Sequence, residues 1–283
     1  MLNDRVLDVE DAVMPAIGAI KADKLSRLIG TPGAPVLVDL RDAGDLIPGS
    51  VRRCAERVEQ WAGALAGRPV IAICADGGAS AAVAAWLRHA GAGAEILEGG
   101  VRAWLAAGLP LVREAVLPPR DEAGRTRWIT RARPKVDRIA CPWLIRRFVD
   151  PGAAILFAAP NDVVAAGERL DAAPFDVEGV FWSHRGELCT FDTMVEELGL
   201  AGWPGLDRLS AIVRGADTAR PEIAPQAAGL LAASLGLSRM YADDHAQLEA
   251  GMTLYDAFYR WCRDAVDETH DWVSHTPRTA ARV

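Results

Sequence analysis

The sequence lacks the features of a membrane protein, a secreted disulfide protein and a zinc ribbon. No stretch approaches the ~20 uninterrupted apolar residues that cross a bilayer, and residues 1–6 carry charges where a signal peptide needs an apolar core. The five cysteines are odd in number, widely scattered and without a CxxC pair. We therefore expect a cytoplasmic protein with no membrane partner; its oligomeric state is left open.

Two further classes are disfavoured by what the sequence does not contain. The 283 residues carry a net charge of −7, whereas a nucleic-acid partner requires a basic surface for phosphate contacts. No flavin or nicotinamide fingerprint is visible, and Gly30-Thr-Pro-Gly33 is not one. The length and the hydrophobic content of 51% fit two globular domains.

The most informative feature present is Cys74. It ends an apolar run, Val70-Ile-Ala-Ile-Cys74, and opens a loop of small residues before an alanine-rich helix. A thiol between a buried strand and a helix N-terminus faces unpaired backbone N–H groups, and these favour the thiolate. The alternative is a buried strand-end thiol that only packs. The predicted active-site loop is Ala75, Asp76, Gly77, Gly78, Ala79 and Ser80.

The region around Cys74 predicts an α/β domain. Strand-like runs at 36–40, 70–74 and 95–98 alternate with helical runs, which indicates a parallel sheet flanked by helices. The predicted helices are 21–29, 56–66, 80–90 and 100–107.

This pattern resembles a rhodanese domain over residues 16–112. The resemblance is carried by Val36-Leu-Val-Asp39-Leu-Arg41-Asp42, the cysteine loop, Glu98-Gly-Gly100 and Trp104. It implies that Cys74 takes sulfur from a small donor, carries it as a persulfide and passes it to a thiol acceptor. It also implies that this transfer requires no cofactor. The family loop often carries arginines, whereas this loop has Asp76 and Ala79 and no basic residue before Arg88, so the donor stays open.

A proline-rich, charged stretch divides the chain. Pro118-Pro119-Arg-Asp-Glu suits a short stiff connector, and we predict a linker over 113–127. The second domain, 128–265, is predicted to be α+β and rich in helix, followed by a polar tail over 266–283. Its predicted strands begin near Arg127 and Ala154, and its predicted later helices are 191–199, 206–215, 225–236 and 243–264.

The second domain contains the distinctive segment VDRIACPWLIRRF. Pro142 at the first position of a helix would make Cys141 its N-cap. This segment, with SHRGELCTF, GAD, AAGLL, ADDH and YDAFYRWC, resembles the C-terminal domain of the ChrB family of chromate-resistance proteins. The resemblance implies a chromate-stress role. Because the N-terminal regulatory domain of full ChrB proteins is not matched, transcription-factor activity is not carried over.

Two groups of polar residues in the second domain are candidate binding sites. A basic set could bind an oxyanion such as chromate or sulfate, because guanidinium groups offer forked donors, although salt bridges within this acidic domain would explain it equally. The candidates for that site are Arg131, Lys135, Arg138 and Arg146.

The second group of polar residues has side chains that zinc or iron accepts as ligands, but its members do not have the spacing of a known metal-binding motif. Helix capping would explain some of these residues equally well. The candidate metal ligands are His184, Cys189, Asp217 and His245.

The leading hypothesis is a sulfurtransferase of the thiosulfate or persulfide type. The alternative is a chromate- or metal-sensing or sequestering protein with an idle rhodanese-like domain. A chromate reductase that uses Cys141 or Cys189 as electron donor is a third possibility.

Overall fold

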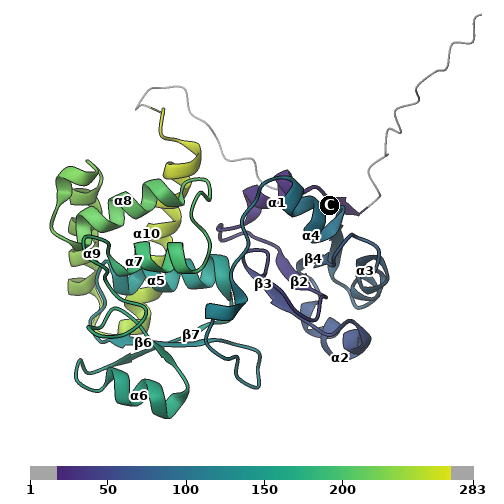
Figure 1. Ribbon diagram of the computed structural model, residues 1–283, viewed down its shortest axis with the longest axis horizontal. Coiled ribbons are helices and arrows are strands. Elements are labelled where there is room, and N and C mark those ends of the chain that lie inside the picture. The colour runs from purple at the N-terminus through teal and green to yellow at the C-terminus, as the bar shows by residue number, and fades with distance from the viewer. Residues whose placement is uncertain (1–17, 269–283) are drawn as a thin grey trace, which may run out of the picture.

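The first half of the chain folds around a five-stranded parallel sheet (Figure 1). The computed structural model describes residues 18–268, so residues 16–17 of the predicted first domain and 269–283 of the predicted tail lie outside the described residues. The strand order is β1-β5-β4-β2-β3. The strands are β1 (Ala19–Ile20), β2 (Val36–Asp39), β3 (Ser50–Arg52), β4 (Pro69–Ile73) and β5 (Gly93–Leu97).

Both faces of this sheet are buried. Ile71 and Ile73 of β4 enter one core, whereas Val70 and Ala72 enter another, because successive side chains of a strand point to opposite faces. Helices α1 and α4 contribute to the first core, and α2 and α3 to the second. Their bounds are α1 (Ala22–Leu28), α2 (Val58–Trp61), α3 (Ser80–His89) and α4 (Gly100–Ala106).

The helical run predicted over 56–66 consists of three short segments. The segment divides into a 3-10 turn at Ala55–Arg57, the single turn α2, and a second 3-10 turn at Ala62–Leu65. Gly63 lies in the last of these turns, and glycine is among the poorest helix formers, which disfavours a continuous α-helix here.

The second half contains a smaller parallel sheet and most of its helices lie to one side (Figure 1). Its strand order is β7-β6-β8, and the helix-rich α+β prediction is confirmed. The strands are β6 (Arg127–Arg131), β7 (Ala154–Ala158) and β8 (Ala173–Pro174). The helices are α5 (Asp137–Leu144), α6 (Val163–Leu170), α7 (Thr190–Glu197), α8 (Leu206–Asp217), α9 (Ala227–Met240) and α10 (Asp244–Asp264).

Helix α5 corrects the prediction for Pro142. The helix begins at Asp137, so Pro142 lies inside it and Cys141 is not an N-cap. A proline here removes a backbone hydrogen bond, but Ile139 and Trp143 on either side are fully buried, and their burial favours the helix. The chain then continues as a π-helical turn, Ile145–Val149.

The two halves of the chain pack against each other and share one hydrophobic core. The ring of Trp104 in α4 stacks on that of Trp203, with centroids 6.1 Å apart. Gly30 lies so close to the second domain that an added Cβ would meet the Tyr259 ring at 2.9 Å. Within the linker, the backbone N–H of Arg113 donates to Leu198 O at 3.0 Å. The domains are therefore held in a fixed arrangement by packing.

Among the helices that the structure describes, none is both long enough and apolar enough to cross a membrane.

Candidate functional site

The Cys74 loop connects the carboxyl end of β4 to the start of α3. The sulfur is held from two sides: the N–H of Gly77 donates to Sγ at 3.1 Å, and the hydroxyl oxygen of Ser80 lies 3.5 Å from it. Asp76 Oδ1 accepts the N–H of Gly78 at 3.1 Å, which fixes the turn. Cys74 is only 4% exposed. The predicted loop residues therefore surround the predicted thiol.

These contacts lower the pKa of Cys74. Burial of the sulfur raises its pKa, but the Ser80 hydroxyl and the N–H groups of Asp76, Ser80 and Gly77 together outweigh burial, because each stabilises the negative charge of the thiolate. The loop thus favours the form of cysteine that acts as a nucleophile.

The start of α4 packs against the Cys74 loop and hydrogen-bonds its backbone. The N–H of Val101 donates to Cys74 O, and that of Arg102 donates to Ala75 O, both at 3.0 Å. Gly100 makes this approach possible: it has a φ of +59°, and a Cβ there would lie 2.6 Å from the N of Asp76. The glycine pair found in the sequence therefore serves close backbone packing under the loop.

Arg102 is a residue of this site that the sequence did not reveal. Its Nη2 lies 3.3 Å from Oδ2 of Asp76, and both side chains are exposed. The loop itself has no arginine, but Arg102 reaches it from 26 positions further along the chain. Only a sheet register that aligns the ends of β4 and β5 could have predicted this neighbour.

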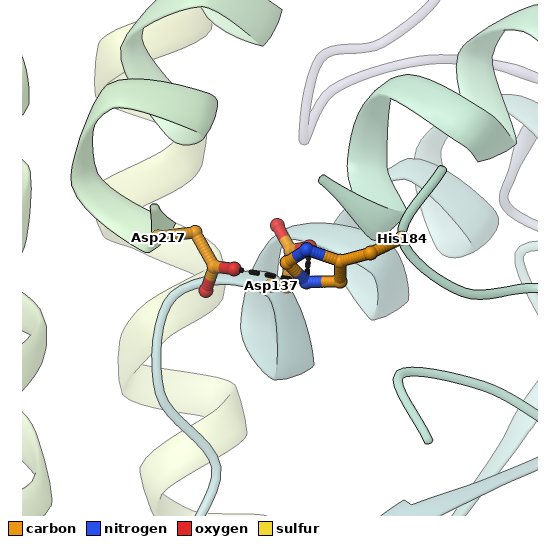
Figure 2. A group of neighbouring side chains, drawn as sticks. All are labelled: Asp137, His184 and Asp217. Atoms are coloured by element: carbon orange, nitrogen blue, oxygen red, sulfur yellow. Dashed lines mark ion pairs between the residues drawn. The ribbon is translucent and has the colours of Figure 1, made fainter. Parts of the chain in front are cut away.

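The second polar cluster surrounds His184. Its Nε2 lies 3.1 Å from Asp217 Oδ2, 3.5 Å from Asp176 Oδ1 and 3.7 Å from Asp137 Oδ2. Figure 2 shows the side chains of Asp137 and Asp217 directed toward the His184 ring. The three aspartates come from the first residue of α5, the loop after β8 and the last residue of α8. Separate segments of the second domain thus meet at one imidazole.

The electrostatics of this cluster are unusual. Complete burial, followed by the charges of Asp217 and Asp176, raises the pKa of Asp137 well above its ordinary value. Burial also raises the pKa of Asp217. The hydrogen bond to Asp176 raises the pKa of His184 to about 9, although partial burial opposes this. Perturbed pKa values of this kind cluster at functional sites.

The backbone around the cluster is strained. Val136, next to Asp137, has a φ of +38°, and Ala219, two residues after Asp217, has a φ of +56°. Positive φ values are costly for residues with a Cβ, most of all for a β-branched one, and are concentrated at functional sites.

The predicted metal candidates are only partly brought together. His184 and Asp217 meet, and Asp137, which the sequence did not single out as a ligand, joins them. Cys189 is fully buried at the N-cap of α7, where burial and the charge of Asp137 raise its pKa. His245 is not in this group: its Nε2 lies 3.0 Å from Ile155 O.

The predicted anion candidates mostly pair with carboxylates. Arg131 and Arg138 both contact Oδ2 of Asp176, at 2.9 and 3.2 Å. Arg146 forms an ion pair with Glu249 at 2.6 Å, whereas Lys135 is exposed. Two of the arginines thus hold the Asp176 oxygen that does not face His184. The anion site stays a prediction.

The two cysteines considered as electron donors are inaccessible. Cys141 and Cys189 have no exposed surface, and burial raises the pKa of Cys141 well above its ordinary value. Buried protonated thiols are poor nucleophiles and poor reductants of a polar anion.

Comparison with known proteins finds a match for each half of the chain. Residues 21–107 match the rhodanese-like domain and residues 128–262 match the ChrB, C-terminal domain. The chain is 34% identical over 146 residues to Protein ChrB of Cupriavidus metallidurans. That match covers 50% of this chain and 43% of ChrB, so the chain spans less than half the length of this relative.

Solved structures of rhodanese-type proteins each match about a third of the chain. A rhodanese-related protein from Thermoplasma volcanium is 25% identical over 33% of this chain and 96% of its own, with a TM-score of 0.31. A rhodanese homologue from the extremely thermophilic bacterium Thermus thermophilus is 25% identical over 30% of this chain and 98% of its own, with a TM-score of 0.27.

Proposed function

The chain joins a rhodanese-like domain to a ChrB C-terminal domain, and on this basis we propose that it is a sulfurtransferase in which Cys74 carries sulfane sulfur as a persulfide. The observation that carries the proposal is the hydrogen bond from Gly77 N–H to the Cys74 sulfur, at 3.1 Å, in a loop that also places Ser80 beside it. A loop that stabilises a thiolate also stabilises the terminal anionic sulfur of a persulfide.

The transfer consists of two displacements at sulfur. The Cys74 thiolate attacks the outer sulfur of the donor, a sulfur–sulfur bond forms at Cys74, and the donor's own sulfur–sulfur bond breaks. Sulfite leaves when the donor is thiosulfate, and a thiolate leaves when it is a persulfide. An acceptor thiolate then attacks the outer sulfur of Cys74 and takes it, which returns the Cys74 thiolate. No external oxidant or reductant is consumed.

The charges around the loop favour a less charged donor. The carboxylate of Asp76 accepts a hydrogen bond from Gly78 N–H and lies 4.0 Å from the sulfur, and Arg102, the arginine that reaches the loop, is paired with that carboxylate. Thiosulfate, a dianion, therefore meets little net positive charge at the loop. We propose a persulfide as the preferred donor.

For the second domain we propose a role in chromate resistance, which its match to the ChrB C-terminal domain supports. Packing of Trp104 against Trp203 holds the two domains together, so the sulfur-carrying loop and the ChrB domain act as parts of one packed molecule.

A sensing or sequestering protein with an idle rhodanese-like domain is the second candidate. The observations that favour it are the 4% exposure of Cys74 and the carboxylate of Asp76 next to its sulfur. A donor would have to reach a nearly covered thiol past a negative charge.

Sulfur-transfer activity separates the two candidates. We expect the purified full chain to transfer sulfur from a persulfide to a small thiol, and Cys74→Ser to abolish the transfer. Cys54→Ser is the matched control, because Cys54 is an exposed cysteine of the same domain outside the loop and should be dispensable. Equal activity of the wild type and Cys74→Ser, or no activity above the uncatalysed rate in the folded wild type, would favour the sensing protein.

A further inference from the structure

The cluster around His184 has the geometry of a metal site. Zinc bonds of about 2.0–2.2 Å to nitrogen and oxygen place neighbouring ligand atoms of a tetrahedral site about 3.3–3.5 Å apart. The separations of His184 Nε2 from the oxygens of Asp217, Asp176 and Asp137 are 3.1, 3.5 and 3.7 Å. One ligand atom from each of Asp137, His184 and Asp217 lies within 4.8 Å of the other two.

A second observation, independent of this spacing, comes from Asp137. Its side chain is completely buried, yet within the described part of the chain its Oδ1 has no hydrogen-bond partner. Its Oδ2, in contrast, accepts the N–H groups of Thr190 and Phe191, at 2.6 and 3.3 Å. Leaving a buried carboxylate oxygen unpaired is costly, and a cation bound by the Asp137 carboxylate, whose Oδ2 faces His184, would offset that cost. Figure 2 shows this carboxylate next to the ring of His184.

The surroundings of the cluster also suit a metal. The N-terminus of α7 fixes the orientation of Asp137, and two arginines fix Asp176 from its far side, as outer-shell partners do for ligands. His184 is 41% exposed and Asp217 19% exposed, so an ion can enter from solvent.

We propose that Asp137, His184 and Asp217 bind one divalent transition-metal ion of the zinc or ferrous class, with an oxygen of Asp176 beside them as a fourth donor. One imidazole with carboxylates is the ligand set that such ions accept, whereas calcium and magnesium prefer oxygen alone. The proposal stands independently of sulfur transfer by Cys74.

Zinc titration of the chelator-treated full chain tests this site. To separate it from thiol binding, every protein carries Cys54→Ser and Cys74→Ser. We expect one equivalent of Zn²⁺ to bind in calorimetry and to raise the melting temperature. His184→Ala and Asp217→Asn should each weaken binding by at least about 10–100-fold, the cost of disturbing even an outer-shell partner.

The matched control is His245→Ala, which removes a histidine of the same domain that lies outside the cluster. It should bind Zn²⁺ as the parent does. Asp217→Asn preserves the size and shape of a partly exposed side chain, so it keeps the test valid if His184→Ala unfolds. Unchanged zinc affinity in Asp217→Asn, or absence of saturable zinc binding in the folded parent, overturns the proposal and leaves these residues as an ion-pair network.

Discussion

The glycine under the Cys74 loop gives the sharpest test of how the first site is built. Gly100 and Gly108 both have positive φ, +59° and +70°, so alanine at either position incurs a conformational cost of about 1–2 kcal/mol. They differ in space. A Cβ at Gly108 meets nothing within 4 Å, whereas a Cβ at Gly100 would lie 2.6 Å from the N of Asp76 and 2.7 Å from the carbonyl carbon of Ala75.

Gly100→Ala should therefore cost about 1–3 kcal/mol more than Gly108→Ala, because an added methyl group in a filled site forces the backbone to move. The free energy of unfolding, from urea denaturation followed by tryptophan fluorescence, measures this difference. The clash is with the loop backbone, so Gly100→Ala should also raise the pKa of Cys74, read from the pH dependence of its alkylation. Equal costs for the two variants, with equal pKa values, would refute the role given to Gly100.

Three further predictions concern the loop and the core. The alkylation rate of Cys74 should rise with pH at a midpoint below that of an ordinary cysteine. Ser80→Ala should move this midpoint upward, because it removes a hydrogen bond that stabilises the thiolate. An unmoved midpoint would contradict this. Ala79→Arg should increase turnover of thiosulfate more than that of a persulfide, because it adds a charge-assisted contact. Steady-state kinetics with both donors measure this, and a larger increase with the persulfide would contradict it. Asp256→Ala should lower the free energy of unfolding by about 3–5 kcal/mol, because Arg147 donates to both oxygens of this buried carboxylate at 2.8 Å. Urea denaturation measures the loss, and a loss below about 1 kcal/mol would refute this prediction.

The elements that the sequence predicted best have strong local patterns. Strand β4 is a continuous apolar run that ends at Cys74, and α3 is an alanine-rich segment that follows a glycine turn. Both depend mainly on residues close in the chain, so periodicity was sufficient to find them. Strands β1 and β3 have two and three residues, and such short strands exist only because neighbouring strands pair with them.

The errors and omissions arose where distant segments decide the outcome. Pro142 alone suggests the start of a helix, whereas burial of its neighbours extends α5 back to Asp137. The contact between Arg102 and Asp76 depends on the sheet, and Asp137 meets His184 only once the chain between them has folded. Residue types in the second domain indicated a candidate metal site, but its members could not be selected without the fold.

The hydrophobic core that the two domains share could also not be predicted from the sequence. Proline and charge predict a short stiff connector between two domains, but they do not reveal that Trp104 and Trp203 stack across the boundary. Apolar residues on a helix show that a face is buried, but not which domain covers it.

Mass spectrometry of the native protein after exposure to a sulfane-sulfur donor tests the central claim most directly. The account predicts an added mass of about 32 Da, one sulfur atom, on Cys74, and its loss on treatment with an acceptor thiol. The Cys54→Ser control should gain the same mass, and Cys74→Ser should gain none. Added sulfur on another cysteine while Cys74 stays unmodified, or no added sulfur in the folded protein, would contradict the account.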